Sequence, residues 1–280
     1  MTSSRPEQAE RAVRPTSEPA SALARAAAAL RTGHPLVQCI TNFVSMDLAA
    51  NLLNAAGASP AMVHDAREAA EFAGLADAVS INIGTPSPAW ADGMLAAAST
   101  ARDRGLAWVL DPVAVGATGY RRELAAQLLE HRPGVIRGNA GEILALAGVA
   151  GASRGVDSAA GVDEVADQAA TLALRLDCVV AVTGASDLIT DGRRRLIIDG
   201  GDPRAPMITA LGCASTALVA ACCSVTDDPL IGAAAALAMI TAAIERAGAD
   251  AAGPGSLRWR LLDELSTLTD DRVAAVSVRS

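Results

Sequence analysis

Two acidic residues stand at positions where their carboxylates could hold a metal ion. Asp111 follows the apolar run Trp108-Val109-Leu110, and Glu142 lies three residues after Asn139 at an expected helix start. Carboxylate and water oxygens are the ligands that Mg²⁺ prefers, so we predict that this pair binds Mg²⁺ or orders its water shell. The structural alternative for Glu142 is a capping box with Asn139, which would serve only the helix start.

A turn that contains glycine opens a long uncharged segment at Thr209-Ala210-Leu211-Gly212-Cys213. The free N–H groups and the dipole of a helix that starts there favour an anion. We expect the same dipole to lower the pKa of the Cys213 thiol, which could then act as a base or as a polar partner toward a substrate hydroxyl. Alternatively, Cys213 is a small buried hydrophobic residue, as Cys222 and Cys223 are expected to be.

Small or polar residues follow five of the expected strands. They are Thr41-Asn42, Gly84-Thr85, Asp111-Pro112, Gly138-Asn139 and Thr183-Gly184. Ligands of open α/β sheets bind at the carboxyl ends of the strands, so this convergence predicts a binding site at that edge. Each of these residues is also typical of a helix cap or a tight turn, which is the alternative for any one of them alone.

The elements that must position these residues alternate along the chain. Short runs rich in β-branched residues separate longer Ala-rich stretches, which predicts an α/β fold with a mostly parallel sheet and helices on both faces. The expected strands are 36–41, 59–63, 78–83, 107–110, 135–137 and 178–182. Residues 188–198 carry Asp191-Gly192 between two apolar runs, which predicts a hairpin with a type I′ turn at an antiparallel edge. Helices are expected over 213–225, 229–247 and 256–265.

The domain organisation is expected to be simple. We predict one domain over residues 20–280 with a surface loop at 148–155, and a disordered leader over residues 1–19, which are rich in Arg, Pro, Ser and Glu. The leader has no apolar core, so it does not predict a secretory signal. The uncharged segment 207–225 is long enough to span a bilayer, but its Ala, Gly, Ser, Thr and Cys content favours a buried core helix and no membrane partner.

Composition excludes several chemistries. All 23 basic residues are arginine, so a Schiff base, covalently held pyridoxal phosphate and a P-loop lysine are excluded. The five cysteines show no paired spacing, which favours reduced thiols in a cytoplasmic protein and argues against structural zinc. Only three histidines occur, which argues against a catalytic zinc site. A net charge of −8 with three Trp, one Tyr and two Phe residues argues against nucleic-acid binding and favours a small-molecule partner.

The motifs resemble those of the hydroxyethylthiazole kinase family, which is part of the ribokinase-like superfamily. The resemblance runs from Pro35 to about Asp263 and leaves mainly the N-terminal leader outside. The resembling stretches, in family order, are PLVQCITNFV, NLLNAAGASPAMV, ADAVSINIGT, VLDPVAVGAT, IRGNAGEI, RGVDS, VAVTGASDLITDG, LGCASTALVAACC and GPGS.

The resemblance implies an activity and a set of roles. It implies phosphorylation by ATP of the primary alcohol of 4-methyl-5-(2-hydroxyethyl)thiazole, a salvage step in thiamine biosynthesis that requires Mg²⁺, in a homotrimer with active sites at subunit interfaces. The implied substrate contacts are Asn42, Val44, Met62 and Ala210, and the implied ATP contacts are Arg137, Thr183 and Gly212. Asp111 and Glu142 match the acidic residues near magnesium, and Cys213 stands where most ribokinase-like enzymes have a catalytic aspartate.

One motif departs from the family pattern. The family commonly has Gly-Thr-Gly-Cys or Gly-Ala-Gly-Cys before the long helix, whereas this chain has Ala210-Leu211-Gly212-Cys213. Alanine tolerates a positive φ poorly, so this departure bears on the loop geometry and on the fit to the thiazole. We expect the anion site itself to persist, because backbone donors do not depend on the side chain.

Two other functions share the expected fold. ATP-dependent dehydratases that repair hydrated nicotinamide cofactors are ribokinase-like, but they lack the ITNFV and GASPAM segments. A nucleotide-binding protein that has lost activity through its altered ALGC loop is the second. The presence of Asp111, Glu142, Arg137 and Cys213 together weighs against such a loss.

Overall fold

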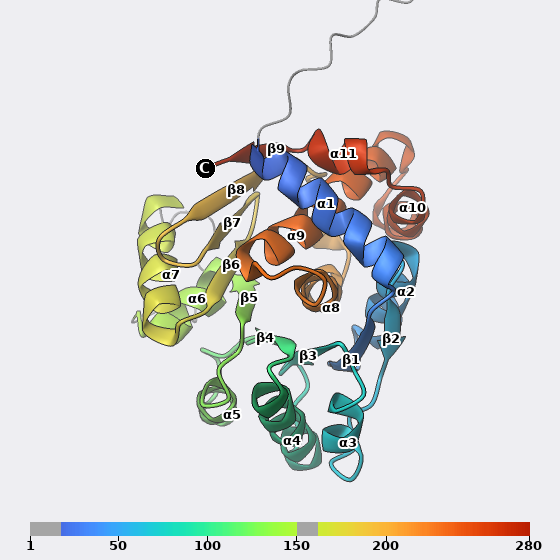
Figure 1. Cartoon of the computed structure of the whole chain (residues 1–280). Coiled ribbons are helices and arrows are strands. Elements are labelled where there is room, and N and C mark those ends of the chain that lie inside the picture. Colours follow the sequence, from blue (N-terminus) through green and yellow to red (C-terminus); the bar gives the residue numbers. More distant parts are fainter. Residues whose placement is uncertain (1–17, 150–161) are drawn as a thin grey trace, which may run out of the picture.

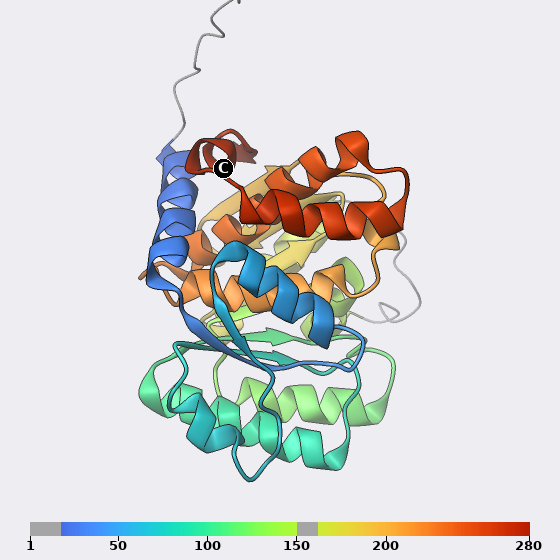
Figure 2. The same ribbon diagram turned by 90° about the vertical axis from the view of Figure 1, so that its right-hand side faces the viewer.

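The computed structural model describes residues 18–149 and 162–280, and it shows a sheet between two layers of helices (Figures 1 and 2). The described residues form a nine-stranded sheet of order β2-β1-β3-β4-β5-β6-β7-β8-β9. The strands are β1 (Leu36–Ile40), β2 (Ser59–Ala61), β3 (Ala78–Asn82), β4 (Ala107–Asp111), β5 (Val135–Asn139), β6 (Val179–Thr183), β7 (Ser186–Thr190), β8 (Arg195–Asp199) and β9 (Ser277–Arg279). Pairing is parallel from β2 to β6 and antiparallel from β6 to β9, which confirms the predicted fold class.

The helices divide between the two faces of the sheet (Figure 2). One core contains residues of α1 (Glu18–Gly33), α2 (Met46–Ala56), α8 (Leu211–Cys223), α9 (Pro229–Asp250), α10 (Pro254–Ser266) and α11 (Asp270–Ala274). The other contains residues of α3 (Ala69–Ala73), α4 (Pro88–Arg104), α5 (Gly119–Leu129), α6 (Ala140–Ala147) and α7 (Val162–Leu176). A short 3₁₀ helix, η1 (Ala205–Met207), precedes α8.

The strands supply side chains to both cores in alternation. In β4, Val109 belongs to the core under α8, whereas Trp108 and Leu110 belong to the core on the opposite face. Successive side chains of a strand point to opposite faces, and strands covered on both faces are apolar throughout. The apolar runs in the sequence are therefore the central parallel strands.

The Ala-rich helices α8 and α9 form the centre of one core. Helix α8 begins at Leu211, two residues before the expected Cys213. Every residue from Ala214 to Cys223 is buried, as predicted for a core helix. The 22-residue helix α9 is long and apolar enough to cross a membrane, but 83% of its most apolar window is buried inside the fold. It is thus a core helix of the fold.

The antiparallel edge differs in detail from its prediction. Strands β7 and β8 form the expected hairpin, but Thr190 pairs with Arg195, so four residues connect them and the predicted type I′ turn is wrong. The Asp191 carboxylate accepts hydrogen bonds from the N–H groups of Arg193 (2.8 Å) and Arg194 (2.7 Å), which organises the longer loop.

Some predictions fall outside the described residues. Residues 1–17 of the predicted leader, positions 150–155 of the predicted surface loop and the RGVDS stretch belong to the ranges 1–17 and 150–161, which the structure does not describe. Helix α1 already begins at Glu18, two residues before the predicted start of the domain.

Candidate active site

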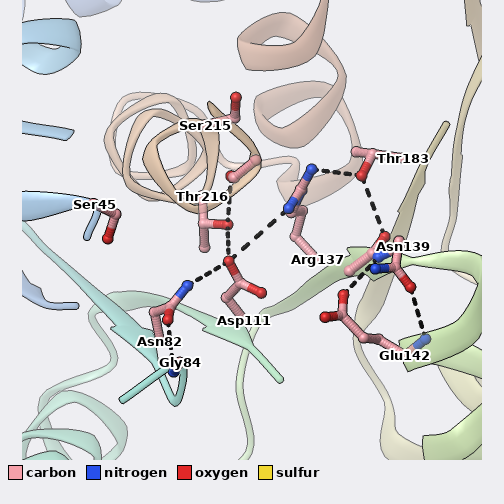
Figure 3. A network of polar contacts seen from close by, with 12 residues as sticks. Ser45, Asn82, Gly84, Asp111, Arg137, Asn139, Glu142, Thr183, Ser215 and Thr216 are labelled. Atoms are coloured by element: carbon pink, nitrogen blue, oxygen red, sulfur yellow. Dashed lines mark hydrogen bonds and ion pairs between the residues drawn. The ribbon is translucent and has the colours of Figure 1, made fainter. Parts of the chain in front are cut away.

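The carboxyl ends of the parallel strands meet the start of α8 at one edge of the sheet (Figure 3). Asn82, Asp111, Asn139 and Thr183 are the last residues of β3, β4, β5 and β6. A cavity of about 940 Å³ opens between this edge, the first turn of α8 and the segment 200–209. The structure therefore places a cavity at the edge where the sequence predicts a binding site.

Seven of the ten predicted site residues line this cavity. They are Asp111, Arg137, Glu142, Thr183, Ala210, Gly212 and Cys213. The other three, Asn42, Val44 and Met62, do not line it.

Asp111 is the most enclosed charged residue of the site, with 1% of its surface exposed. Its Oδ2 accepts hydrogen bonds from the Asn82 side-chain amide (2.7 Å) and the Thr216 hydroxyl (2.9 Å), and it lies 3.9 Å from Nη1 of Arg137 (Figure 3). Its Oδ1 is buried and has no hydrogen-bond partner among the described residues. A buried carboxylate oxygen without a partner is costly, so this atom is suited to receive a ligand.

The environment of Asp111 shifts its acidity. Burial, which disfavours the charged form, raises the pKa of the carboxyl to about 6, and the nearby Glu142 acts in the same direction. Arg137, Thr216 and Asn82 lower the pKa and so limit this rise.

Arg137 supplies the positive charge of the site. Its Nη2 donates a hydrogen bond to the Thr183 hydroxyl, which in turn donates to the carbonyl oxygen of Gly138 at 3.4 Å. Its buried Nε has no partner among the described residues. A Cβ at Gly212 would lie 2.8 Å from Nη1 of Arg137, so the glycine lets the start of α8 approach the guanidinium.

Glu142 joins a helix cap to the neighbouring loop. It forms the capping box predicted as its structural alternative, because Oε2 accepts from the Asn139 N–H (2.8 Å) and Asn139 Oδ1 accepts from the Glu142 N–H (2.9 Å). Its Oε1 also accepts a hydrogen bond from the N–H of Ala114 (3.0 Å). Because Glu142 also lines the cavity, the cap does not exclude a role toward a ligand.

The donor set of this cavity fits Mg²⁺. The unpartnered Oδ1 of Asp111 and the carboxylate of Glu142 are hard oxygen donors on the same cavity. The described residues contain no group of three or more His, Cys, Asp or Glu side chains that could hold a metal ion. The remaining ligands of Mg²⁺ would therefore be water and phosphate oxygens, which is its usual mode of binding in phosphoryl-transfer enzymes.

The start of α8 contains Ala210 and Leu211, where the family pattern has Gly-Thr or Gly-Ala. Ala210 adopts φ 69° and ψ 5°, a left-handed conformation that disfavours any residue with a Cβ. No side chain of the described residues caps this helix start. The loop thus keeps the conformation that glycine favours. The Leu211 N–H donates to the Ile208 carbonyl oxygen at 3.2 Å, so the N–H groups of Gly212 and Cys213 are the first-turn donors suited to an anion.

Cys213 lies on the first turn of α8, and the expectation for its acidity is wrong. Burial and the negative charge of Asp111 raise the pKa of its thiol, although Asn82, Asn42 and Arg137 lower it in part. The desolvation cost of a thiolate is the largest of these contributions. Cys213 is partly exposed, whereas Cys39, Cys178, Cys222 and Cys223 are buried free thiols.

The remaining predicted contacts do not line the cavity. The Asn42 amide donates to Oδ1 of Asn82 (2.8 Å) and accepts from the N–H groups of Val44 and Ser45, so Asn42 also organises the start of α2. Val44 is 59% exposed, and the neighbouring Phe43 is 69% exposed. Met62 packs partly buried against the core.

Two residues that contact Asp111, Asn82 and Thr216, were not predicted from the sequence. Asn82 accepts a hydrogen bond from Asn42. Its own amide donates to Asp111, which Thr216 also contacts from α8 (Figure 3). Asn82 is the last residue of an otherwise apolar strand, and Thr216 lies one turn after Gly212. A polar residue at the end of an apolar strand, or one turn into an uncharged helix, is the sequence feature that could have indicated them.

The fold is that of the ribokinase-like kinases. The model of the hydroxyethylthiazole kinase family matches residues 27–271. The chain belongs to the hydroxyethylthiazole kinase family, which confirms the resemblance seen in its motifs.

Individual relatives support this assignment. The chain is 52% identical over 266 residues to a hydroxyethylthiazole kinase from Gemmatimonas aurantiaca, covering 95% of this chain and 94% of that protein. It is 54% identical over 242 residues to one from Cereibacter sphaeroides, covering 86% and 92%.

Solved structures agree with the fold. The hydroxyethylthiazole kinase structure from Pyrococcus horikoshii matches with a TM-score of 0.85 at 38% identity, covering 92% of this chain and 98% of that one. An ADP complex of Bacillus subtilis pyridoxal kinase matches with a TM-score of 0.58 at 20% identity over 76% of this chain and 92% of its own, which shows the shared fold alone.

Proposed function

We propose that this kinase transfers the γ-phosphoryl group of ATP to the primary alcohol of 4-methyl-5-(2-hydroxyethyl)thiazole, as a salvage step in thiamine biosynthesis. The observation that carries the proposal is one cavity that combines Asp111, Glu142, Arg137 and the start of α8 with Cys213. Phosphoryl transfer requires mainly positioning and charge neutralisation, and these groups are of the kind that supply both.

We assign the carboxylates of this cavity to the metal ion and its guanidinium to the phosphates. Asp111 and Glu142 would hold Mg²⁺, which neutralises phosphate charge and orients the phosphates when it is bound. Arg137, with its unpartnered Nε, would hold a phosphate oxygen, and the first-turn amides of α8 near Gly212 would bind the transferred group. Thr183 keeps the guanidinium of Arg137 in place and faces the same cavity.

Cys213 would contact the alcohol. Its raised pKa means that it is a neutral thiol at physiological pH, so it orients the hydroxyl by a hydrogen bond rather than acting as a strong base. Ala210, which stands where the family commonly has glycine, lines the same cavity.

The enzyme is proposed to act as a homotrimer with active sites between subunits. Val44 and Met62, which the family pattern assigns to the thiazole, lie off the cavity of a single chain. Phe43 is exposed beside Val44, and its ring lies 4.7 Å from that of Trp90. A partner subunit that covers this apolar surface would complete the thiazole pocket. Light scattering of the native protein tests the subunit number, and a monomer with full activity would refute the arrangement.

The cytoplasm is the proposed location. All five cysteines lie in the described ranges and are free, and four of them are buried, as is typical of proteins from a reducing compartment.

A coupled assay of ADP release tests the substrate. The thiazole alcohol is compared with pyrimidine, pyridoxal and sugar alcohols, because pyridoxal kinases share the fold. We expect the thiazole alcohol to support the highest kcat/KM. ADP release with another alcohol but not with the thiazole would show that the substrate assignment is wrong.

A further inference from the structure

Arg121, in the first turn of α5, extends its guanidinium to the loops that follow β3 and β4. Its Nη1 donates to the carbonyl oxygens of Ile83 and Val113, and the second of these bonds measures 2.9 Å. Its Nη2 donates to the carbonyl oxygen of Gly84 at 2.7 Å. The N–H of Arg121 donates to the hydroxyl of the helix cap Thr118 at 3.3 Å. One half-buried side chain therefore joins two loops that are separate in sequence.

The loop after β3 holds one side of Asp111. The Gly84 N–H donates to Oδ1 of Asn82 at 2.9 Å, and the Asn82 amide donates to Asp111 at 2.7 Å. A Cβ at Gly84 would lie within 2.9 Å of the Asn42 side chain, so this loop is closely packed. Movement of Gly84 would be transmitted through Asn82 to the carboxylate.

The loop after β4 holds Glu142. Val113 is followed by Ala114, which has a φ of 53°, and the Ala114 N–H donates to Oε1 of Glu142. A positive φ is uncommon for residues other than glycine, so the surrounding contacts must maintain it. The bond from Arg121 to the Val113 carbonyl is such a contact, one residue away.

The chemistry of the guanidinium suits this position. Carbonyl groups at the carboxyl ends of strands have no further strand residue to pair with, and they need other donors when they are buried. Arginine presents several N–H groups in a fixed planar fork, whereas a lysine ammonium is a compact point charge. Three carbonyl acceptors from two loops match the fork.

We propose that Arg121 is a positioning residue for phosphoryl transfer, which fixes the loops after β3 and β4 so that Asn82 and Ala114 hold Asp111 and Glu142 in place. Arg121 does not line the cavity, so it acts through these loops and not on the substrate. The catalytic part of this inference rests on the proposed function, because it assumes that both carboxylates act in the transfer.

The test compares Arg121→Ala with Arg122→Ala. Arg122 is the next residue of the same helix; it is exposed and donates to the Gly116 carbonyl at 3.2 Å. Hydrogen exchange without substrate is expected to be about tenfold or more faster at the Gly84 and Ala114 amides in Arg121→Ala, and unchanged in Arg122→Ala.

Kinetics complete the comparison. We expect kcat of Arg121→Ala to fall about tenfold or more while KM for the alcohol changes less than about threefold, because only the loops near the carboxylates loosen. Added guanidinium ion at non-denaturing concentration should restore part of kcat in Arg121→Ala and leave Arg122→Ala unaffected.

Several results would overturn the inference. Equal exchange in the two variants would show that Arg121 does not hold the loops, and faster exchange with unchanged kcat would show that the loops do not matter for the transfer. If Arg121→Ala does not fold, Arg121→Lys takes its place. Hydrogen exchange at Gly84 and Ala114 and a kcat equal to those of the wild type in that variant would refute a role for the planar guanidinium. A wild-type enzyme inactive on the thiazole alcohol would overturn the proposed function instead, and the exchange comparison would still decide whether Arg121 holds the loops.

Discussion

Thr216→Val removes one of the two hydrogen bonds that Asp111 Oδ2 accepts and leaves the shape of the side chain nearly unchanged. The Thr216 hydroxyl lies 2.9 Å from Oδ2 in a fully buried position. A hydrogen bond to a charged group contributes about 1.5–3 kcal/mol, so the loss near pH 7.5 should be of that order. Since one pKa unit corresponds to about 1.4 kcal/mol, the pKa of Asp111 should rise by roughly one unit or more.

The sign of the pH dependence follows from the raised pKa. Burial places the pKa of Asp111 at about 6 in the folded state, well above the usual value of about 3.9 for an unfolded chain. The folded state therefore binds the proton more tightly, and this group lowers the free energy of unfolding as pH rises from about 4 to above 6. The variant, with a still higher pKa, should lose more stability near pH 7.5 than near pH 5, where the carboxyl is protonated.

Urea unfolding at the two pH values measures this difference. Ser215→Ala is the matched control, because Ser215 is the adjacent buried residue and donates its hydroxyl to the Leu211 carbonyl at 2.8 Å, within the same helix. Its cost should be similar at both pH values. A cost of Thr216→Val that is independent of pH, or no greater than that of Ser215→Ala, would refute the view that Thr216 stabilises a charged Asp111.

Four further predictions concern single positions. Cys213→Ala should lower kcat by about tenfold or more while the dissociation constant of ATP changes little, and unchanged turnover would make Cys213 a packing residue. Glu142→Gln should raise the Mg²⁺ concentration needed for half-maximal activity, which a magnesium titration measures; an unaltered requirement would remove Glu142 from the metal site. Ala210→Gly should raise the free energy of unfolding by about 1 kcal/mol in urea titrations, because it relieves the left-handed φ of 69°. Burial raises the pKa of Asp187 to about 6, so its charge costs stability as pH rises through that range; in Asp187→Asn, which can still accept from the Gly184 N–H, this loss should be absent from unfolding curves.

The layered fold was predictable because its signals are local. The apolar runs of the parallel strands alternate between two buried faces, and this pattern is visible in segments such as 107–110. The conformation of the hairpin loop was not predictable from the sequence, because it depends on bonds between distant segments. The Arg194 guanidinium, for example, pairs with Asp228, 34 residues away, at 2.7 Å. Strand β9 is only three residues long and, among the described strands, pairs only with β8, so its sequence carries little signal.

The site shows the same division between local and long-range causes. Asp111 and Glu142 follow from the rule that strand ends carry ligands, which needs only the order of elements. Arg137 lies within β5, and only the family resemblance indicated it. The parts played by Asn82 and Thr216 depend on α8 lying against β3 and β4, which no single segment reveals. The pKa of Cys213 was expected to fall because the dipole is a local property, whereas burial beside Asp111, which raises it, is a property of the assembled fold.

The accessibility of the cysteines gives this enzyme a reporter of its own. One thiol of the five, Cys213, is partly exposed in the folded chain, and it lies on the wall of the cavity. A thiol reagent should therefore modify one group per native chain and five per unfolded chain. The speed of the first reaction measures how far a nucleotide or alcohol shields the cavity, and the number of groups modified counts the chains that have opened. A single colorimetric reaction can thus follow ligand occupancy and unfolding in the unmodified wild-type protein.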